Sequence, residues 1–234
     1  MARDQKRRKK STKKAAKRKS QAVGRLHGAS AQAPANVRLI GYEVTCEPLL
    51  DPAYHRLPES VKDQLDKLHR GLIAPGSRDR LAVLLTLIEQ YPDIPQIHNY
   101  LYTTYQQLND WSSARRVLEE TLERFPDYLF GRISYAMDCL DKGETEKVPE
   151  IFENRFSLQL LYPERRRFHI SEVLGFHATM ARYFCARKEF EIAERYYELM
   201  HQIGPGDPRT QFIKELLAPS RLRALYKELL ARKS

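Results

Sequence analysis

A 34-residue spacing between two prolines is the feature that most restricts how this chain can fold. Pro92 and Pro126 each follow an aromatic residue and precede an aspartate. Between them, His98 is followed after seven residues by Tyr105, after nine more by Ala114 and after twelve more by Pro126. An internal repeat of this length is typical of stacked supersecondary units, because one unit alone cannot bury its apolar face.

A second copy of this order runs from His177 through Phe184 and Ala193 to Pro205 with the same three offsets. The copies before and between these two are degenerate, and in the front one Arg80 stands where a small residue is expected. The predicted ranges are 93–126 and 174–207 for the clear copies, 59–92 and 127–160 for the degenerate copies, about 156–173 for an insertion, and 208–232 for two terminal helices.

From Glu59 onward, apolar residues recur at spacings of three and four, interrupted by Gly, Pro, Asn and Asp. This pattern predicts helices joined by short turns, with almost no strand signal. Leu101 and Tyr105 fall on one helix face, and Ala114 and Leu118 fall on a face of the next. The small alanine lets the two helices approach closely. Residues 59–232 are therefore predicted to form one helical domain.

This order of residues resembles the tetratricopeptide repeat (TPR), a helix–turn–helix of about 34 residues with the pattern W-x-x-L-G-x-x-Y, A-x-x-x-F, P. His98 and His177 stand where tryptophan is usual, and Tyr102 and Ala181 replace the glycine. The resemblance implies an all-α fold, a TPR-like superhelical solenoid of antiparallel helix pairs. It also implies that the first helix of each pair lines a concave groove, and that the two histidines serve packing.

Carrying the groove over residue by residue gives seven candidate peptide-binding residues: Gln96, Asn99, Thr103, Gln106, Gln107, Met137 and Arg182. Family members that clamp a terminal carboxylate use Lys, Arg and Asn at set places. In this chain only Asn99 and Arg182 have side chains of these types in the groove. They do not stand at the positions of the clamp, so no carboxylate clamp is expected. Two occupants of the groove stay open, a foreign protein or peptide and the chain's own residues 36–58.

The N-terminal region divides into a tail and an arm. Residues 1–35 read as disordered, because they contain almost nothing to bury. Residues 36–58 regain apolar side chains but are punctuated by Pro48, Pro52 and Pro58, which predicts an extended, turn-rich arm.

The tail carries almost all of the excess charge. Residues 1–25 hold twelve Lys or Arg and one Asp, a net charge of +11, whereas positions 26–234 hold 28 bases and 29 acids. A tail of this kind binds nucleic acid through phosphates without reading sequence. Two other roles of the tail stay open, a nuclear import signal and a solvated tail without a partner. Outside the tail, the three arginines at 165–167 are a minor second candidate for binding nucleic acid. The candidate nucleic-acid-binding residues are Lys6, Arg7, Arg8, Lys9, Lys10, Lys13, Lys14, Lys17, Arg18 and Lys19.

Several classes of function are not expected. No phosphate-binding loop, nucleophile elbow or zinc-protease motif occurs, and no two histidines have metal-ligand spacing, so neither an enzyme nor a metal or cofactor is predicted. Three widely spaced cysteines favour reduced thiols and a cytoplasmic location, or a nuclear one in a eukaryote. The longest apolar stretch, Leu81–Ile88, is far shorter than the roughly 20 residues that span a bilayer, so no membrane partner is expected.

The sequence thus predicts a non-enzymatic adaptor or scaffold that binds a protein or peptide in its groove. The alternative is an RNA- or ribosome-associated factor, in which the basic tail supplies the affinity for nucleic acid.

Overall fold

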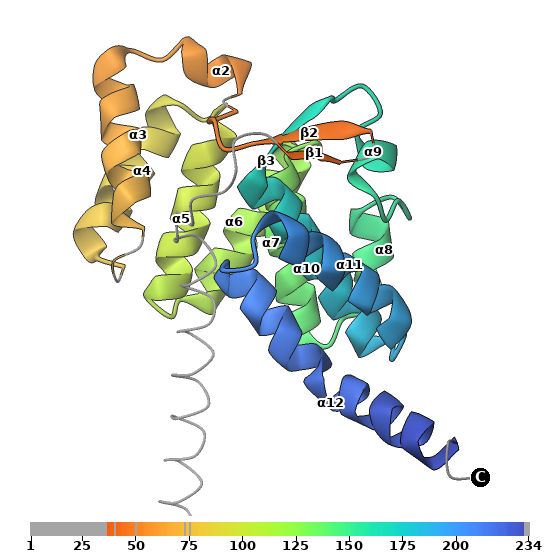
Figure 1. The fold of residues 1–234 in the computed structure, drawn as a ribbon. Helices are drawn as coiled ribbons and strands as arrows, with labels where there is room; N and C mark the ends of the chain where they lie inside the picture. Colours follow the sequence, from red (N-terminus) through yellow and green to blue (C-terminus); the bar gives the residue numbers. More distant parts are fainter. Residues whose placement is uncertain (1–36, 40, 50, 73, 75, 232–234) are drawn as a thin grey trace, which may run out of the picture. The chain divides into compact units, whose positions relative to one another are not determined.

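Helices make up most of the chain in a computed structural model that describes residues 37–39, 41–49, 51–72, 74 and 76–231 (Figure 1). The expected all-α class fits this structure, with a small sheet added to it. The described residues divide into two units, the first formed by 51–125 and the second by 37–49 together with 126–231. The boundary falls after Phe125, between two of the predicted repeat copies.

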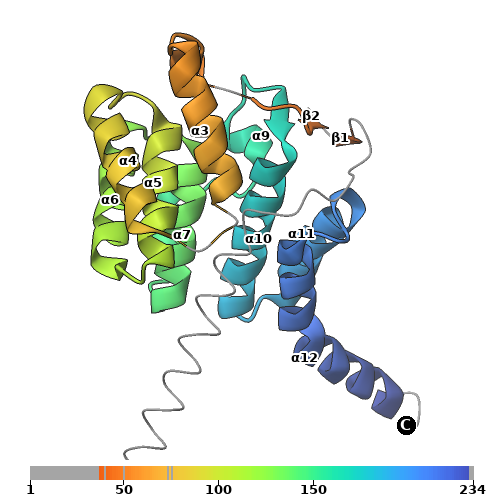
Figure 2. The ribbon, with the colours of Figure 1, turned by 90° about the vertical axis from the view of Figure 1, so that its left-hand side faces the viewer.

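The first unit is a set of helices in which α5 packs against both α4 and α6 (Figure 2). Its interior is closed by Leu84, Ile97 and Leu118, one from each of these helices, all fully buried. Pro95 begins α5 at the first helical turn, where a missing backbone N–H costs nothing. The helices are α2 (Pro52–His55), α3 (Glu59–Gly71), α4 (Arg78–Gln90), α5 (Pro95–Gln107) and α6 (Trp111–Arg124).

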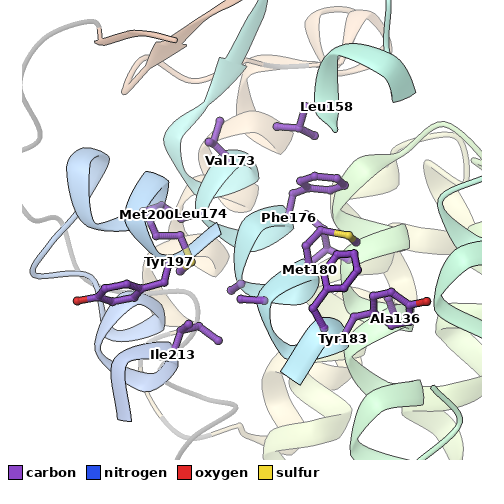
Figure 3. Close-up of a cluster of buried hydrophobic side chains, with 14 of the residues drawn as sticks. Ala136, Leu158, Val173, Leu174, Phe176, Met180, Tyr183, Tyr197, Met200 and Ile213 are labelled. Carbon is purple, nitrogen blue, oxygen red and sulfur yellow. The ribbon is translucent and has the colours of Figure 1, made fainter. Parts of the chain in front are cut away.

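The second unit is built around one long apolar helix, α10. Phe176 and Met180 of α10 are fully buried, and α7, α11 and α12 pack around it (Figure 3). From α11 and α12, Met200 and Ile213 complete this core. The helices are α7 (Leu129–Lys142), α8 (Lys147–Ile151), α9 (Leu158–Leu161), α10 (Ile170–Ala186), α11 (Phe190–Ile203) and α12 (Pro208–Ala231).

Three short strands, which the sequence analysis does not predict, join the arm to the insertion. They are β1 (Val37–Leu39), β2 (Tyr42–Thr45) and β3 (Arg167–His169). Strand β2 lies in the middle, antiparallel to β1 and parallel to β3. Val44 is aligned with Phe168, and both side chains are buried in the core of the second unit. The predicted extended arm thus contains both β1 and β2, and its residues 52–55 form the short helix α2 in the first unit.

One turn geometry recurs in three helix pairs, α5–α6, α7–α8 and α10–α11. Asn109, Gly143 and Lys188 each have a left-handed backbone, with φ of 62°, 81° and 65°. In each turn the next residue donates its N–H to the carbonyl five residues earlier, at 2.8–2.9 Å, which closes the first helix. Asn109 and Gly143 are separated by the same interval as Pro92 and Pro126, so the repeat spacing in the sequence corresponds to a repeated backbone structure.

The second helix of the middle pair is cut short. Helix α8 ends at Ile151, and Glu153 and Asn154 both have a left-handed backbone, with φ of 54° and 57°. The buried guanidinium of Arg132 donates a 2.7 Å hydrogen bond to Glu153, and this bond lowers the pKa of that carboxyl group. Phe152, the residue after α8, is fully buried.

The C-terminal region forms one helix rather than the two terminal helices expected. Helix α12 runs through Pro219, which removes one backbone hydrogen bond without ending the helix. Asp207 precedes it and accepts the N–H of Arg209 at 2.8 Å, and Pro208 is the first residue of the helix. The final predicted residue, 232, lies outside the described residues.

Candidate functional site

The seven predicted groove residues divide between the two units. Five of them lie on α5 in the first unit, whereas Met137 lies on α7 and Arg182 on α10 in the second. Residues 37–49 of the arm belong to the second unit, and they form no hydrogen bond or ion pair there with Met137 or Arg182, whereas its described residues 51–58 belong to the first unit. The part in the second unit is held instead by the sheet, where Tyr42 packs edge-on against Phe168.

Gln107 holds a loop together rather than standing open to a ligand. Its side chain accepts a 2.7 Å hydrogen bond from Arg80 and donates one of 2.7 Å to the carbonyl of Leu72. Arg80 also donates to the carbonyl of Gly71, so these residues tie the end of α3 to α4 and α5. A Cβ at Gly76 would lie 2.7 Å from the Cβ of Gln107, which explains the glycine there. The arginine that breaks the repeat pattern thus has a structural role.

The other four candidates on α5 are only partly available. Thr103 is buried and bonds the carbonyl of Asn99 at 2.9 Å, and Gln106 donates to the hydroxyl of Tyr102. Gln96 and Asn99 are half-buried. The side-chain oxygen of Gln96 is buried without a hydrogen-bond partner within the described structure, which is costly for an amide oxygen. Gln96 and Asn99 stay predictions for the groove.

In the second unit Met137 of α7 and Arg182 of α10 lie next to each other. Arg182 donates a 2.7 Å hydrogen bond to Asp141 and approaches the sulfur of Met137 at 3.3 Å. Its guanidinium also lies 5.7 Å from the ring centroid of Phe212 on α12. We call these four residues the three-helix face, because they come from α7, α10 and α12.

The cations on and beside this face are already engaged by the protein itself. Both terminal nitrogens of Arg182 are used, one by Asp141 and one by the Met137 sulfur. Nearby on α12, Arg209 binds both oxygens of Asp207 and the carbonyl of Ser171, at 2.8–2.9 Å. The face therefore offers an apolar rim around a neutral ion pair, which suits an apolar segment better than a free carboxylate.

Phe212 is the member of this face that the sequence analysis does not identify. It is 39% exposed, as is Leu216 one turn later, whereas the adjacent Ile213 and Leu217 are fully buried. The sequence signal for this is a second pair of apolar residues four apart. Phe212 and Leu216 stand directly before Ile213 and Leu217, so α12 is apolar on more than its buried side.

The two histidines at the tryptophan positions are buried, as expected. The ring of His98 bonds the carbonyl of Pro92 at 3.0 Å, and burial lowers its pKa. His177 packs against Phe176 and Tyr196, and burial lowers its pKa to about 4. Both stay neutral at pH 7, which fits a packing role.

Two of the three cysteines, Cys139 and Cys185, are unsuited to act as nucleophiles, and the described residues include no cluster suited to a metal ion. Cys139 is fully buried, and burial raises the pKa of Cys185 to about 11, with a smaller contribution from Glu194. A thiol with a raised pKa is a poor nucleophile. Over the same residues, no group of three or more His, Cys, Asp or Glu side chains could hold a metal ion.

Two of the three consecutive arginines at 165–167 stabilise the sheet region. The guanidinium of Arg165 lies 4.3 Å from the ring centroid of Phe168. Arg167 forms an ion pair of 3.3 Å with Glu43 across the two parallel strands. Neither is a free surface charge, so this loop is a weaker nucleic-acid site than its sequence indicates.

All ten predicted nucleic-acid-binding residues lie in the tail, outside the described residues: Lys6, Arg7, Arg8, Lys9, Lys10, Lys13, Lys14, Lys17, Arg18 and Lys19. The tail therefore stays a prediction from charge alone.

No protein-family model, curated protein or solved structure matches the chain. Among the described helices, none combines the length and the apolar character needed to cross a bilayer.

Proposed function

We propose that this chain is a TPR-like, non-enzymatic adaptor that binds an apolar protein segment on the three-helix face. The observation that carries the proposal is the pair of half-buried Met137 and exposed Phe212 on either side of the Arg182–Asp141 ion pair. The turn that recurs at the interval of the repeat supports the TPR-like part. Because Arg182 and Asp141 already pair with each other, they offer a ligand little electrostatic attraction. The free energy of binding would come from burial of apolar surface against Met137 and Phe212.

Site-specific photocrosslinking tests this proposal. A benzophenone side chain replaces Met137 in the full-length chain, and the control carries it at Leu160 on α9, which is 63% exposed in the same unit. After irradiation in cell extract, position 137 should give discrete protein adducts that persist after nuclease treatment and that position 160 does not give. Equal adducts at both positions, or none at position 137, would contradict the proposal.

The charge of the tail supports a second candidate function, an RNA- or ribosome-associated factor. A net charge of +11 over positions 1–25 favours polyanions, and positions 1–35 contain no aromatic side chain on which bases could stack. Nuclease separates the two candidates, because partners bound through nucleic acid are lost after treatment.

A further inference from the structure

The sulfur of Met137 differs in its surroundings from the other methionine sulfurs of the described structure. Met180 and Met200 are fully buried in the core of the second unit (Figure 3). Met137 on α7 is half-buried and packs against that core from outside. Because oxidation of a sulfur follows its exposure, Met137 is the described methionine most open to an oxidant.

Met137 also faces a cationic donor that is poorly matched to a thioether. Nη1 of Arg182 lies 3.3 Å from the sulfur, and Nη2 of the same guanidinium donates to Asp141 at 2.7 Å. A thioether sulfur is a weak hydrogen-bond acceptor, so the capacity of Nη1 to donate is largely unused. The side chain of Arg182 is only 17% exposed, so water satisfies this nitrogen at most in part.

We propose that Met137 is a site of reversible oxidation by hydroperoxides, and that its sulfoxide makes the three-helix face polar. The sulfoxide oxygen is a strong acceptor, and it forms a charge-assisted hydrogen bond with Nη1 of Arg182. The guanidinium thus stabilises the oxidised side chain better than the reduced one. The effect on binding rests on the proposed function, because it concerns the same face, whereas the oxidation itself does not.

The reaction needs only a hydroperoxide and the thioether of Met137. A lone pair of the sulfur forms an S–O bond to one peroxide oxygen, and the O–O bond breaks, so the sulfur loses one electron pair and the peroxide gains it. The proton of the transferred hydroxyl passes to the departing oxygen, which leaves as water or as an alcohol. Methionine sulfoxide reductases restore the thioether with electrons from thiols, so the change is reversible.

Oxidation changes the side of the face on which Met137 lies. A partner that buries Met137 and Phe212 gains free energy from apolar contact, whereas a sulfoxide in place of the thioether has to be desolvated. Arg182 is then shared between Asp141 and the sulfoxide. The oxidised face should therefore bind an apolar segment at least about fivefold more weakly than the reduced face.

Peptide mapping by mass spectrometry tests the site. The full-length Cys46→Ser chain is treated with dilute hydrogen peroxide, since this variant lacks the exposed thiol that would compete for the oxidant. Met137 should gain one oxygen atom at least about tenfold faster than Met180 or Met200, which the core protects. Oxidation of Met137 no faster than that of these two core methionines would overturn the assignment.

Nuclear magnetic resonance of the arginine side chains tests the hydrogen bond to the sulfoxide. The guanidinium resonances of Arg182 should shift when Met137 is oxidised. Those of Arg167, which pairs with Glu43 in the sheet of the same unit, should not shift. Met137→Leu treated with peroxide is the second control and should leave the Arg182 resonances in place. Arg182 resonances that are the same before and after oxidation of Met137 would refute the bond.

Photocrosslinking from position 212 tests the effect on the face. A benzophenone side chain replaces Phe212, and the peroxide is removed before cell extract is added. The yield of protein adducts should fall at least about fivefold after oxidation, because the partner then meets a sulfoxide. In the chain that also carries Met137→Leu, the yield should be the same with and without peroxide. An equal fall in both chains, or no fall in either, would overturn the effect on binding.

These measurements separate the inference from the proposed function. If neither position 137 nor position 212 gives adducts before oxidation, the proposed function is refuted, and the effect of oxidation on binding is refuted with it. The peptide map still decides whether Met137 is the oxidised site, because it needs no partner. Circular dichroism of each chain checks that the helices are retained.

Discussion

At the scale of single residues, burial of His177 couples the stability of the second unit to pH. Burial lowers its pKa from 6.5 to about 4, so the unfolded chain takes up a proton at a higher pH than the folded chain. The free energy of unfolding is therefore complete above pH 6.5 and falls as the pH drops from 6.5 towards 4. This shift corresponds to a loss of about 3 kcal/mol.

Urea denaturation from about pH 7 to about pH 4.5 measures this effect. His177→Leu should show a shallower loss of unfolding free energy than wild type over that interval, because no buried imidazole remains to be protonated. His55→Leu is the control, since His55 is exposed. Identical pH dependence in wild type and His177→Leu would show that the buried ring does not set the slope.

The small residue at the repeat's helix contact gives a second prediction at this scale. Ala193 on α11 is fully buried, and α11 packs against α10. Ala193→Leu should overpack this contact and lower the unfolding free energy by about 1–3 kcal/mol. Thermal melting compares it with Ala82→Leu, which changes an exposed alanine on α4. Equal midpoints for the two variants would contradict a close helix contact at Ala193.

At the scale of elements, strand β2 is an integral part of the second unit, although residues 51–125 separate it from the rest. Val44→Ala should open a cavity beside buried Phe168. Loss of these buried methyl groups should lower the stability of that unit by about 2 kcal/mol. Hydrogen exchange should accelerate in β3 and α10 but not in α5. Cys46→Ser, at the exposed residue that follows β2, should change neither. If hydrogen exchange in β3 were unchanged in Val44→Ala, strand β2 would contribute little to the stability of the second unit.

The helices and their turns follow from local signals, whereas the sheet does not. Asp110 accepts the N–H of Ser113 at 3.1 Å and begins α6, as a capping aspartate should. Strand β3 spans only Arg167–His169, and its partner β2 lies far earlier in the chain, so no local periodicity encodes the pairing. The resemblance places Gln107 in a groove, and only the three-dimensional fold shows that Arg80 binds it.

At the scale of the whole molecule, the separation of charge assigns nucleic-acid binding to one segment. Residues 26–234 carry a net charge of −1, and two of the three clustered arginines at 165–167 are engaged with the sheet region. The rest of the chain therefore has no net attraction for a polyanion. Any affinity for RNA should come from the tail, and it should be nearly independent of sequence.

Labelled RNAs of different sequence, titrated at two or more salt concentrations with the full-length chain and with a variant lacking residues 1–35, measure this prediction. The full-length chain should bind all of them with similar affinity, and its affinity should fall steeply with salt because released counterions set the slope. The shortened variant should lose binding while keeping its melting temperature, since the deletion stops before β1. Equal RNA affinity of the two proteins would refute the assignment, and the exposed Arg166 would then be the first residue to test.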